Sequence, residues 1–203
     1  MLRISLTTAI LLFLTTLEGV AAANPQASAA PSVPMQLFTS SDGHFSVMMP
    51  GTPVQASEQA KLSDNVSIAI HEFTISLNND NISYLVMYND YPAGYAEDTP
   101  QNVLARTRDG AVKTKTLNSD QAIDLTVSAG PDPASAKDAS DRGGATDGAV
   151  VPGRAFISSD TDGYNYSVRQ YLRDKRLYQL IVVTNKGFTA PEAEEFMNSF
   201  KVF

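Results

Sequence analysis

An almost unbroken apolar run at residues 176–184 constrains the fold of this chain more than any other stretch. Its letters are Arg-Leu-Tyr-Gln-Leu-Ile-Val-Val-Thr, and positions 180–183 offer no polar face. A strand of this kind is buried on both sides, so the run predicts a central strand with layers of structure above and below it. Strand-like segments at 150–157 and 164–173 precede it and are separated by short polar turns. The three segments therefore predict three adjacent antiparallel strands.

The first half of the domain predicts further strands. Asp42-Gly43 lies between two apolar segments, 36–39 and 45–49, and this is the pattern of a β-hairpin. In residues 66–75 the apolar positions change from even to odd, which predicts a β-bulge near His71-Glu72. Residues 82–88 form a second candidate for a central strand.

Two helices are also predicted. Thr99-Pro100 is a typical start, with Thr99 as the N-cap, and Gly110 predicts the end. A capping-box pattern at 189–192 precedes a second helix, whose apolar residues recur at helical spacing. We expect this second stripe to pack on the sheet: Ala193, Phe196, Met197 and Phe200.

The N-terminus has the pattern of an export signal. Arg3 is followed by a short apolar run and by small residues at 20–23, so residues 1–23 predict a cleavable signal peptide and a periplasmic or extracellular location. Residues 24–34, rich in Pro, Ala and Ser, predict a flexible mature N-terminus. The remainder, 35–203, predicts one domain interrupted by a disordered insertion at 129–149, where Gly, Pro, Asp, Ala and Ser dominate.

Composition excludes several classes of function. The chain has no cysteine, so it has no disulfide, no thiolate metal site and no lipid attached through cysteine. The formal net charge is -7, which disfavours nucleic acid and anionic lipid as partners. The apolar run of the signal segment is too short and too polar to span a membrane. We therefore predict no stable membrane insertion after the signal peptide is cleaved.

No catalytic motif is present in the sequence, and we therefore predict no catalytic residue, no metal site and no cofactor. Asp160-x-Asp162-Gly163 resembles part of a calcium-binding loop, but the residues at essential ligand positions of that loop are not calcium ligands. A hairpin turn is therefore favoured. The alternative to a noncatalytic protein is a metal-dependent or hydrolytic envelope enzyme. It would use His44, His71 and nearby carboxylates such as Glu72.

A basic cluster near the turn before the central strand is the best candidate for a binding site. Arg169, Tyr171 and Arg173 share one face of a strand, and Lys175 and Arg176 follow them. Together these five residues could bind an anionic group. The competing explanation is that they are edge charges that prevent aggregation between sheets.

Three groups of residues resemble a known superfamily. They are Phe38-x-x-x-Asp42-Gly43-x-Phe45 with Pro50 and Pro53, then Pro152-Gly153-Arg154-x-Phe156, and finally 176–180 with 199–201. The pattern resembles uncharacterised bacterial exported proteins similar to the PsbP/Mog-type αβα sandwich. The resemblance implies an α+β fold: a single twisted, mostly antiparallel β-sheet with helices packed on its faces. None of that superfamily's binding residues can be matched to positions here.

These observations predict an exported, noncatalytic binding or assembly domain of unknown ligand. The absence of a catalytic constellation in a chain with a complete core is the main reason. The expected partner is another envelope or secreted protein, and the sequence does not define the oligomeric state.

Overall fold

The computed structural model describes residues 33–63, 65–95, 97–126 and 148–203. These residues form ten strands and two helices. The predicted signal peptide, nearly all of the predicted N-terminal segment 24–34 and nearly all of the predicted insertion 129–149 lie outside the described residues. Those three predictions therefore stay predictions.

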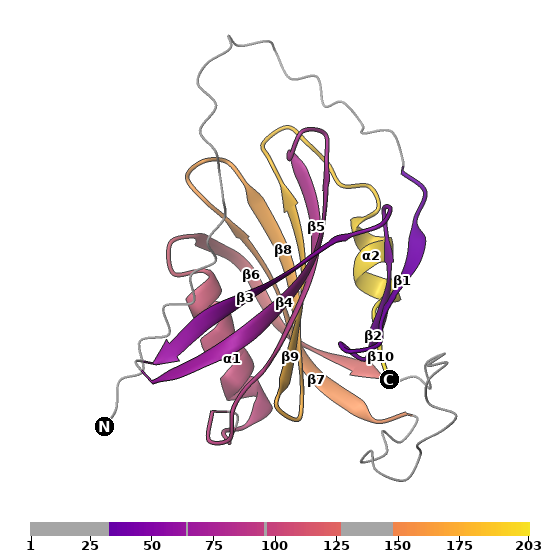
Figure 1. Cartoon of the computed structure of the whole chain (residues 1–203). Helices are drawn as coiled ribbons and strands as arrows, with labels where there is room; N and C mark the ends of the chain where they lie inside the picture. The colour runs from indigo at the N-terminus through magenta and orange to yellow at the C-terminus, as the bar shows by residue number, and fades with distance from the viewer. Residues whose placement is uncertain (1–32, 64, 96, 127–147) are drawn as a thin grey trace.

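A seven-stranded antiparallel sheet forms the centre of the described structure, with strand order β3-β4-β5-β9-β8-β7-β6 (Figure 1). Its strands are β3 (Val54–Ser63), β4 (Val66–Leu77), β5 (Ile82–Asp90), β6 (Thr116–Thr126), β7 (Val150–Ser159), β8 (Asn165–Arg173) and β9 (Arg176–Thr184). The predicted adjacency of the last three is confirmed, because β7 pairs with β8 and β8 pairs with β9. The apolar run at 176–184 is the middle strand of the seven, as predicted.

A second sheet makes the expected single-sheet α+β sandwich wrong. β1 (Gln36–Ser40), β2 (Phe45–Met49) and β10 (Lys201–Val202) form a separate three-stranded antiparallel sheet. Pro50 and Pro53 end β2 before the chain enters β3, so the first hairpin is not continued into the large sheet. The described chain is thus mostly β, and one face of the large sheet is covered by a second sheet together with a helix.

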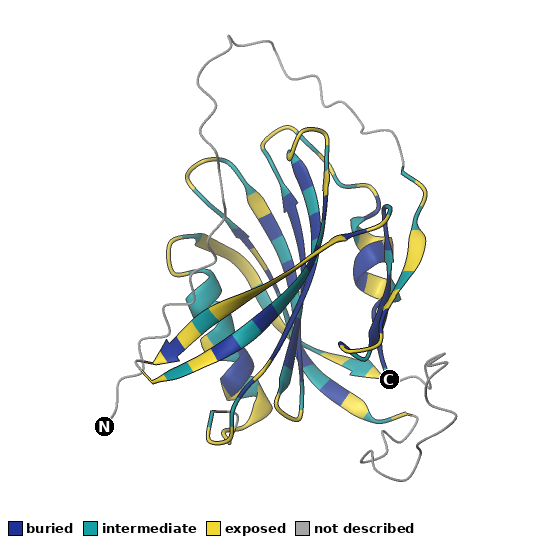
Figure 2. Ribbon diagram, viewed as in Figure 1, coloured by how far each residue is buried: buried dark blue, intermediate teal, exposed yellow. Residues whose placement is uncertain are grey.

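The two faces of the large sheet carry two separate cores. On one face, α2 (Ala193–Ser199) and the small sheet pack against Tyr84, Tyr178 and Leu180. On the other face, α1 (Pro100–Ala111) packs through Val103 and Leu104. Figure 2 shows the buried residues concentrated along the central strands and on the inner sides of both helices.

The predicted bulge at His71-Glu72 is absent from β4. Its pairings with β3 and β5 run without interruption through both positions, and the register shift lies in β3 between Lys61 and Ser63. The change from even to odd apolar positions has another cause. Ile68 and Ile70 bury in the core under α1, whereas Phe73 and Ile75 bury in the core under α2. A strand can therefore change its buried face without changing its register.

The helix ends differ from the capping predictions. α1 begins as expected, with Thr99 as N-cap and Pro100 in the first turn, but the Thr99 side chain makes no capping hydrogen bond. It continues through Gly110 to Ala111. α2 begins at Ala193 without the predicted capping box. The side chain of Glu192 instead accepts a hydrogen bond from the Tyr84 hydroxyl, which fixes the helix to the sheet.

Two glycines of the superfamily-like motifs are explained by close packing. A Cβ at Gly43 would lie 2.6 Å from the Phe45 ring, and one at Gly153 would lie 2.5 Å from the Tyr171 ring. These contacts leave no room for a side chain. The motif glycines are therefore required by the fold.

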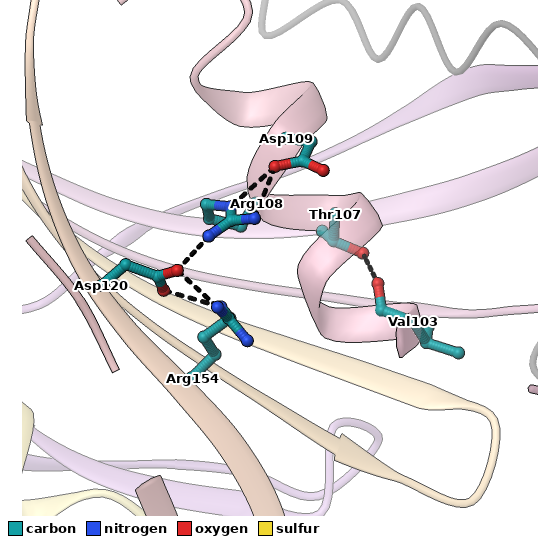
Figure 3. A network of polar contacts seen from close by, with 6 residues as sticks. All are labelled: Val103, Thr107, Arg108, Asp109, Asp120 and Arg154. Atoms are coloured by element: carbon teal, nitrogen blue, oxygen red, sulfur yellow. Dashed lines mark hydrogen bonds and ion pairs between the residues drawn. The ribbon is translucent and has the colours of Figure 1, made fainter. Parts of the chain in front are cut away.

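A partly buried ion-pair network joins α1 to the edge of the large sheet (Figure 3). Asp120 on β6 accepts hydrogen bonds from Arg154 on β7, one of them from Nε at 2.6 Å, and pairs with Arg108 on α1. The hydrogen bond to Asp120 raises the pKa of Arg154. Arg108 also pairs with the exposed Asp109. Charge-assisted bonds at this level of burial fix the position of the helix over the sheet.

Candidate binding groove

A groove of about 880 Å³ lies between α1 and the large sheet. One helix is too narrow to cover this face, and its contacts are with β7 and β8, on one side of the sheet centre. The β3–β4 hairpin forms the opposite wall. The space between them is left unfilled by side chains of the described residues.

The floor of the groove follows from strand alternation. Successive side chains of a strand point to opposite faces, so every second residue of β4, β5 and β9 enters the groove. On β5 these are Ser83, Leu85, Met87 and Asn89. On β9 they are Leu177, Gln179, Ile181 and Val183. The six-residue distance from Ser83 to Asn89 makes the floor about 20 Å long, at roughly 3.3 Å per residue.

The floor of the groove is mixed in polarity. Leu85 lies beside Ile181 in the central part, whereas Met87 lies between Glu72 on β4 and Gln179 on β9. At one end, Ser83 and Ser76 lie with their hydroxyls 3.2 Å apart. Pockets of 300–1,000 Å³ with an apolar lining and a few polar groups are typical sites for small molecules.

Asn89 is the polar group at the other end of the floor. Its side chain is 4% exposed, and its Nδ2 has no hydrogen-bond partner among the described residues. A buried donor without a partner costs about 1–3 kcal/mol, so buried amides are nearly always paired. Asn89 is opposite Leu177 in the register, and both line the groove.

The lining of the groove carries charges of both signs. Glu58, Glu72 and Asp80 line the groove together with Lys61 and Lys115. Lys115 is partly engaged, because its Nζ donates to the carbonyl of Ala111 at 3.3 Å and lies 4.7 Å from the Tyr166 ring centre. The lining is therefore slightly acidic on balance and carries no excess of basic groups.

The predicted basic cluster lies on the other side of the sheet or at the end of its strands. Arg169 and Arg173 do share one face, as expected, but both guanidinium groups bind the C-terminal region. Arg169 donates to the carbonyl of Met197 and to Asn198, each at 2.9 Å, and Arg173 donates to the carbonyl of Phe203 at 3.0 Å. These arginines hold α2 and the small sheet in place.

Of the other three members of the cluster, two are held by contacts within the protein and one is exposed. Tyr171 is 2% exposed and stacks on Phe200 with ring centres 5.7 Å apart. Arg176 makes a bidentate pair with Asp90, with both N–O distances 2.7 Å. Lys175 alone is exposed in the turn. The explanation as edge charges fails too, because β8 and β9 are interior strands of the sheet.

The histidine alternative gains no support from the described residues. Among them, no three His, Cys, Asp or Glu side chains lie close enough to hold a metal ion. His71 stacks on Tyr88, with ring centres 4.6 Å apart and planes inclined by 15°. His44 lies in the first hairpin turn, at φ 53°.

The groove itself was not predicted from the sequence. One signal was available: Gln179 interrupts the apolar run of β9, and Asn89 follows the apolar positions of β5. Both are amides in strands that are otherwise buried, and a polar residue in such a strand needs a partner. Their presence on one face becomes evident only when β5 is placed beside β9.

Comparisons with known proteins find similarity to solved structures. The chain matches no family model and no curated protein. Among solved structures, the solution structure of cyanobacterial PsbP (CyanoP) from Synechocystis sp. PCC 6803 is similar, with 12% sequence identity and a TM-score of 0.49. The match covers 94% of this chain and 99% of that chain. At this identity and TM-score the likeness transfers no residue, ligand or partner.

Within the described residues, no helix is long and apolar enough to cross a membrane. The predicted export signal lies outside them, so the exported location stays a prediction.

Proposed function

We propose that this protein is a noncatalytic binding domain, and that the groove between α1 and the large sheet holds an elongated, mainly apolar small molecule. The observation that carries the proposal is the open volume of about 880 Å³ over a floor to which Leu85, Met87 and Ile181 contribute apolar surface. Water held against such a floor is unfavourable, at about 25 cal/mol for each Å² of apolar surface. A ligand that covers Leu85, Met87 and Ile181 would recover this energy.

The shape of the groove favours a small molecule over a flat protein surface. Specific protein interfaces bury roughly 800 Å² on each partner, and they are mostly shallow. The groove lies between α1 and the β3–β4 hairpin, its floor is about 20 Å long, and its volume of about 880 Å³ is in the range typical of small-molecule sites. Export to the envelope and a partner protein there, to which the ligand would be delivered, remain part of the proposal and rest on the N-terminal sequence.

Binding of the uncharged fluorophore N-phenyl-1-naphthylamine tests the proposal directly. The probe brightens when it leaves water, and the chain has no tryptophan to interfere. Ala60→Trp places an indole in the wall of the groove, on the edge strand β3, where the fold can tolerate it. We expect saturable binding by the wild type and an affinity reduced at least about fivefold in this variant, which corresponds to ~1 kcal/mol.

Gln59→Trp is the matched control. Gln59 is exposed, lies next to Ala60 and points to the opposite face of β3. Its affinity for the probe should equal that of the wild type. Absence of saturable binding by the wild type, or an equal loss in both variants, would contradict the proposal.

A further inference from the structure

We propose that Asn89 selects ligands that carry an uncharged carbonyl group, such as an amide, at the end of an apolar chain. The inference rests on the proposed binding function of the groove and specifies its ligand. It begins from the Asn89 side chain, which is 4% exposed, lines the groove and has its Nδ2 unpaired among the described residues.

The groups around Asn89 leave its donor available to a ligand. Tyr91 and Thr107, which also line this end, lie with their hydroxyl oxygens 3.3 Å apart. Thr107 in addition donates to the carbonyl of Val103 at 3.0 Å. Leu177, opposite Asn89, has no polar atom in its side chain. The amide of Asn89 is therefore the polar group at this end that needs a partner.

A primary amide is the most complementary ligand group for this position. Its carbonyl oxygen accepts a hydrogen bond from Nδ2, and its own NH₂ group can donate to the Oδ1 of the same side chain. The match holds for either orientation of the Asn89 amide. A ligand carbonyl without the NH₂ group satisfies half of this arrangement.

A carboxylate is disfavoured at the same position. The cations that line the groove, Lys61 and Lys115, are offset by three carboxylates that also line it: Glu58, Glu72 and Asp80. The guanidinium of Arg176 is committed to Asp90 and lies against Tyr88, which faces the opposite side of the sheet. An ionised group beside Asn89 would be buried without a counter-charge, and this is costly.

Competition with N-phenyl-1-naphthylamine separates these ligand classes. Hexadecanamide, hexadecanoate and hexadecane have chains of equal length and differ in the terminal group. We expect the amide to displace the probe about tenfold more effectively than the carboxylate, which is the scale of one buried hydrogen bond. Asn89→Leu should reduce the affinity for the amide about tenfold relative to the affinity for hexadecane.

Ser83→Ala is the matched control, because Ser83 lies on the same strand and face at the opposite end of the groove. It should leave the amide preference intact. A purely structural Asn89 would instead give a destabilised Asn89→Leu variant, whereas a ligand-binding Asn89 predicts a melting temperature equal to or above that of the wild type.

The outcomes of this experiment distinguish the two proposals. Saturable probe binding with equal affinity for amide and carboxylate, or no effect of Asn89→Leu, would overturn the role of Asn89 and leave the groove function standing. No probe binding by the wild type would overturn the groove function. Displacement of the probe by a synthetic peptide of residues 24–34, and by none of the amphiphiles, would assign the groove to the chain itself and overturn both.

Discussion

The two faces of the seven-stranded sheet are built from the same strands, yet one is closed and the other is open. The closed face is covered by α2 and the small sheet, and it is filled by aromatic rings: Phe45 has five ring neighbours with centres 5.5–6.3 Å away. Among the described residues, the open face is covered by α1 alone and retains a groove of about 880 Å³.

The contrast separates stability from function. Rings that interlock on the closed face leave no space for a ligand, so substitutions there should act on folding. Side chains that line the open face have water or ligand as neighbours on one side. Substitutions there should act on binding and have smaller effects on folding.

The largest expected effect compares one residue from each face. Phe45→Ala should reduce the free energy of unfolding by about 3–5 kcal/mol, because it leaves a cavity among rigid rings. Met87→Ala on the groove floor should cost about 2 kcal/mol, the lower limit for a buried methionine, since part of its surroundings is already open. Urea unfolding followed by tyrosine fluorescence measures both. Equal losses would show that the open face is packed as firmly as the closed one.

A medium effect is expected at the network that holds α1 over the groove. Asp120→Asn leaves Arg108 and Arg154 without their shared carboxylate, and the three side chains are 14–19% exposed. We expect a loss of about 1–3 kcal/mol, together with weaker binding of N-phenyl-1-naphthylamine. Asp109→Asn is the control, because Asp109 is 65% exposed and should contribute almost nothing. Unchanged probe binding in Asp120→Asn would mean that α1 keeps its place without the network.

The smallest expected effect on stability compares two neighbouring cations at the start of β9, Arg176 and Lys175. Arg176→Ala removes the pair with Asp90 and the contact with the Tyr88 ring, 4.9 Å away. Because Asp90 is 42% exposed, solvent screening limits the loss to about 1 kcal/mol. Lys175→Ala, in the exposed turn, should change nothing. If both variants fold with wild-type stability but lose binding to an anionic partner, the basic cluster would regain its place as a candidate site.

The pH dependence of the same pair has a definite sign. Hydrogen bonds from Arg176 lower the pKa of Asp90 below its usual value. The pair therefore contributes stability fully above the unfolded pKa of about 3.9, and the contribution is lost as the pH falls through the lower, folded pKa. The difference in unfolding free energy between wild type and Asp90→Asn should shrink below about pH 4. A difference that stays constant from pH 7 to pH 2.5 would contradict this assignment.

Local patterns predicted much of the fold. The β7–β8–β9 arrangement follows from apolar runs and tight turns, which depend on residues close in sequence. The second sheet was missed because β10 pairs with β2 across more than 150 residues, and β10 has only two residues, too few for a pattern. The bulge prediction failed for a related reason: the change of buried face in β4 depends on which layer covers each end of the strand.

The contacts of the basic cluster could not be predicted, because the partners are distant in sequence. The arginines were correctly placed on one face, but their acceptors come from the C-terminal region and are backbone carbonyls for the most part. Every residue has a backbone carbonyl, so the sequence does not show which carbonyl accepts a hydrogen bond. An arginine bound to a carbonyl therefore cannot be distinguished from a free arginine by sequence.

The sequence by itself determined most of the longer strands, their alternation and the central position of 176–184, because these depend on periodicity and short-range turns. The tertiary structure alone decided which face is closed and which is open. That difference arises from the unequal size of the covering layers, a helix and a small sheet on one side and one narrow helix on the other. No local pattern records the volume left between distant elements.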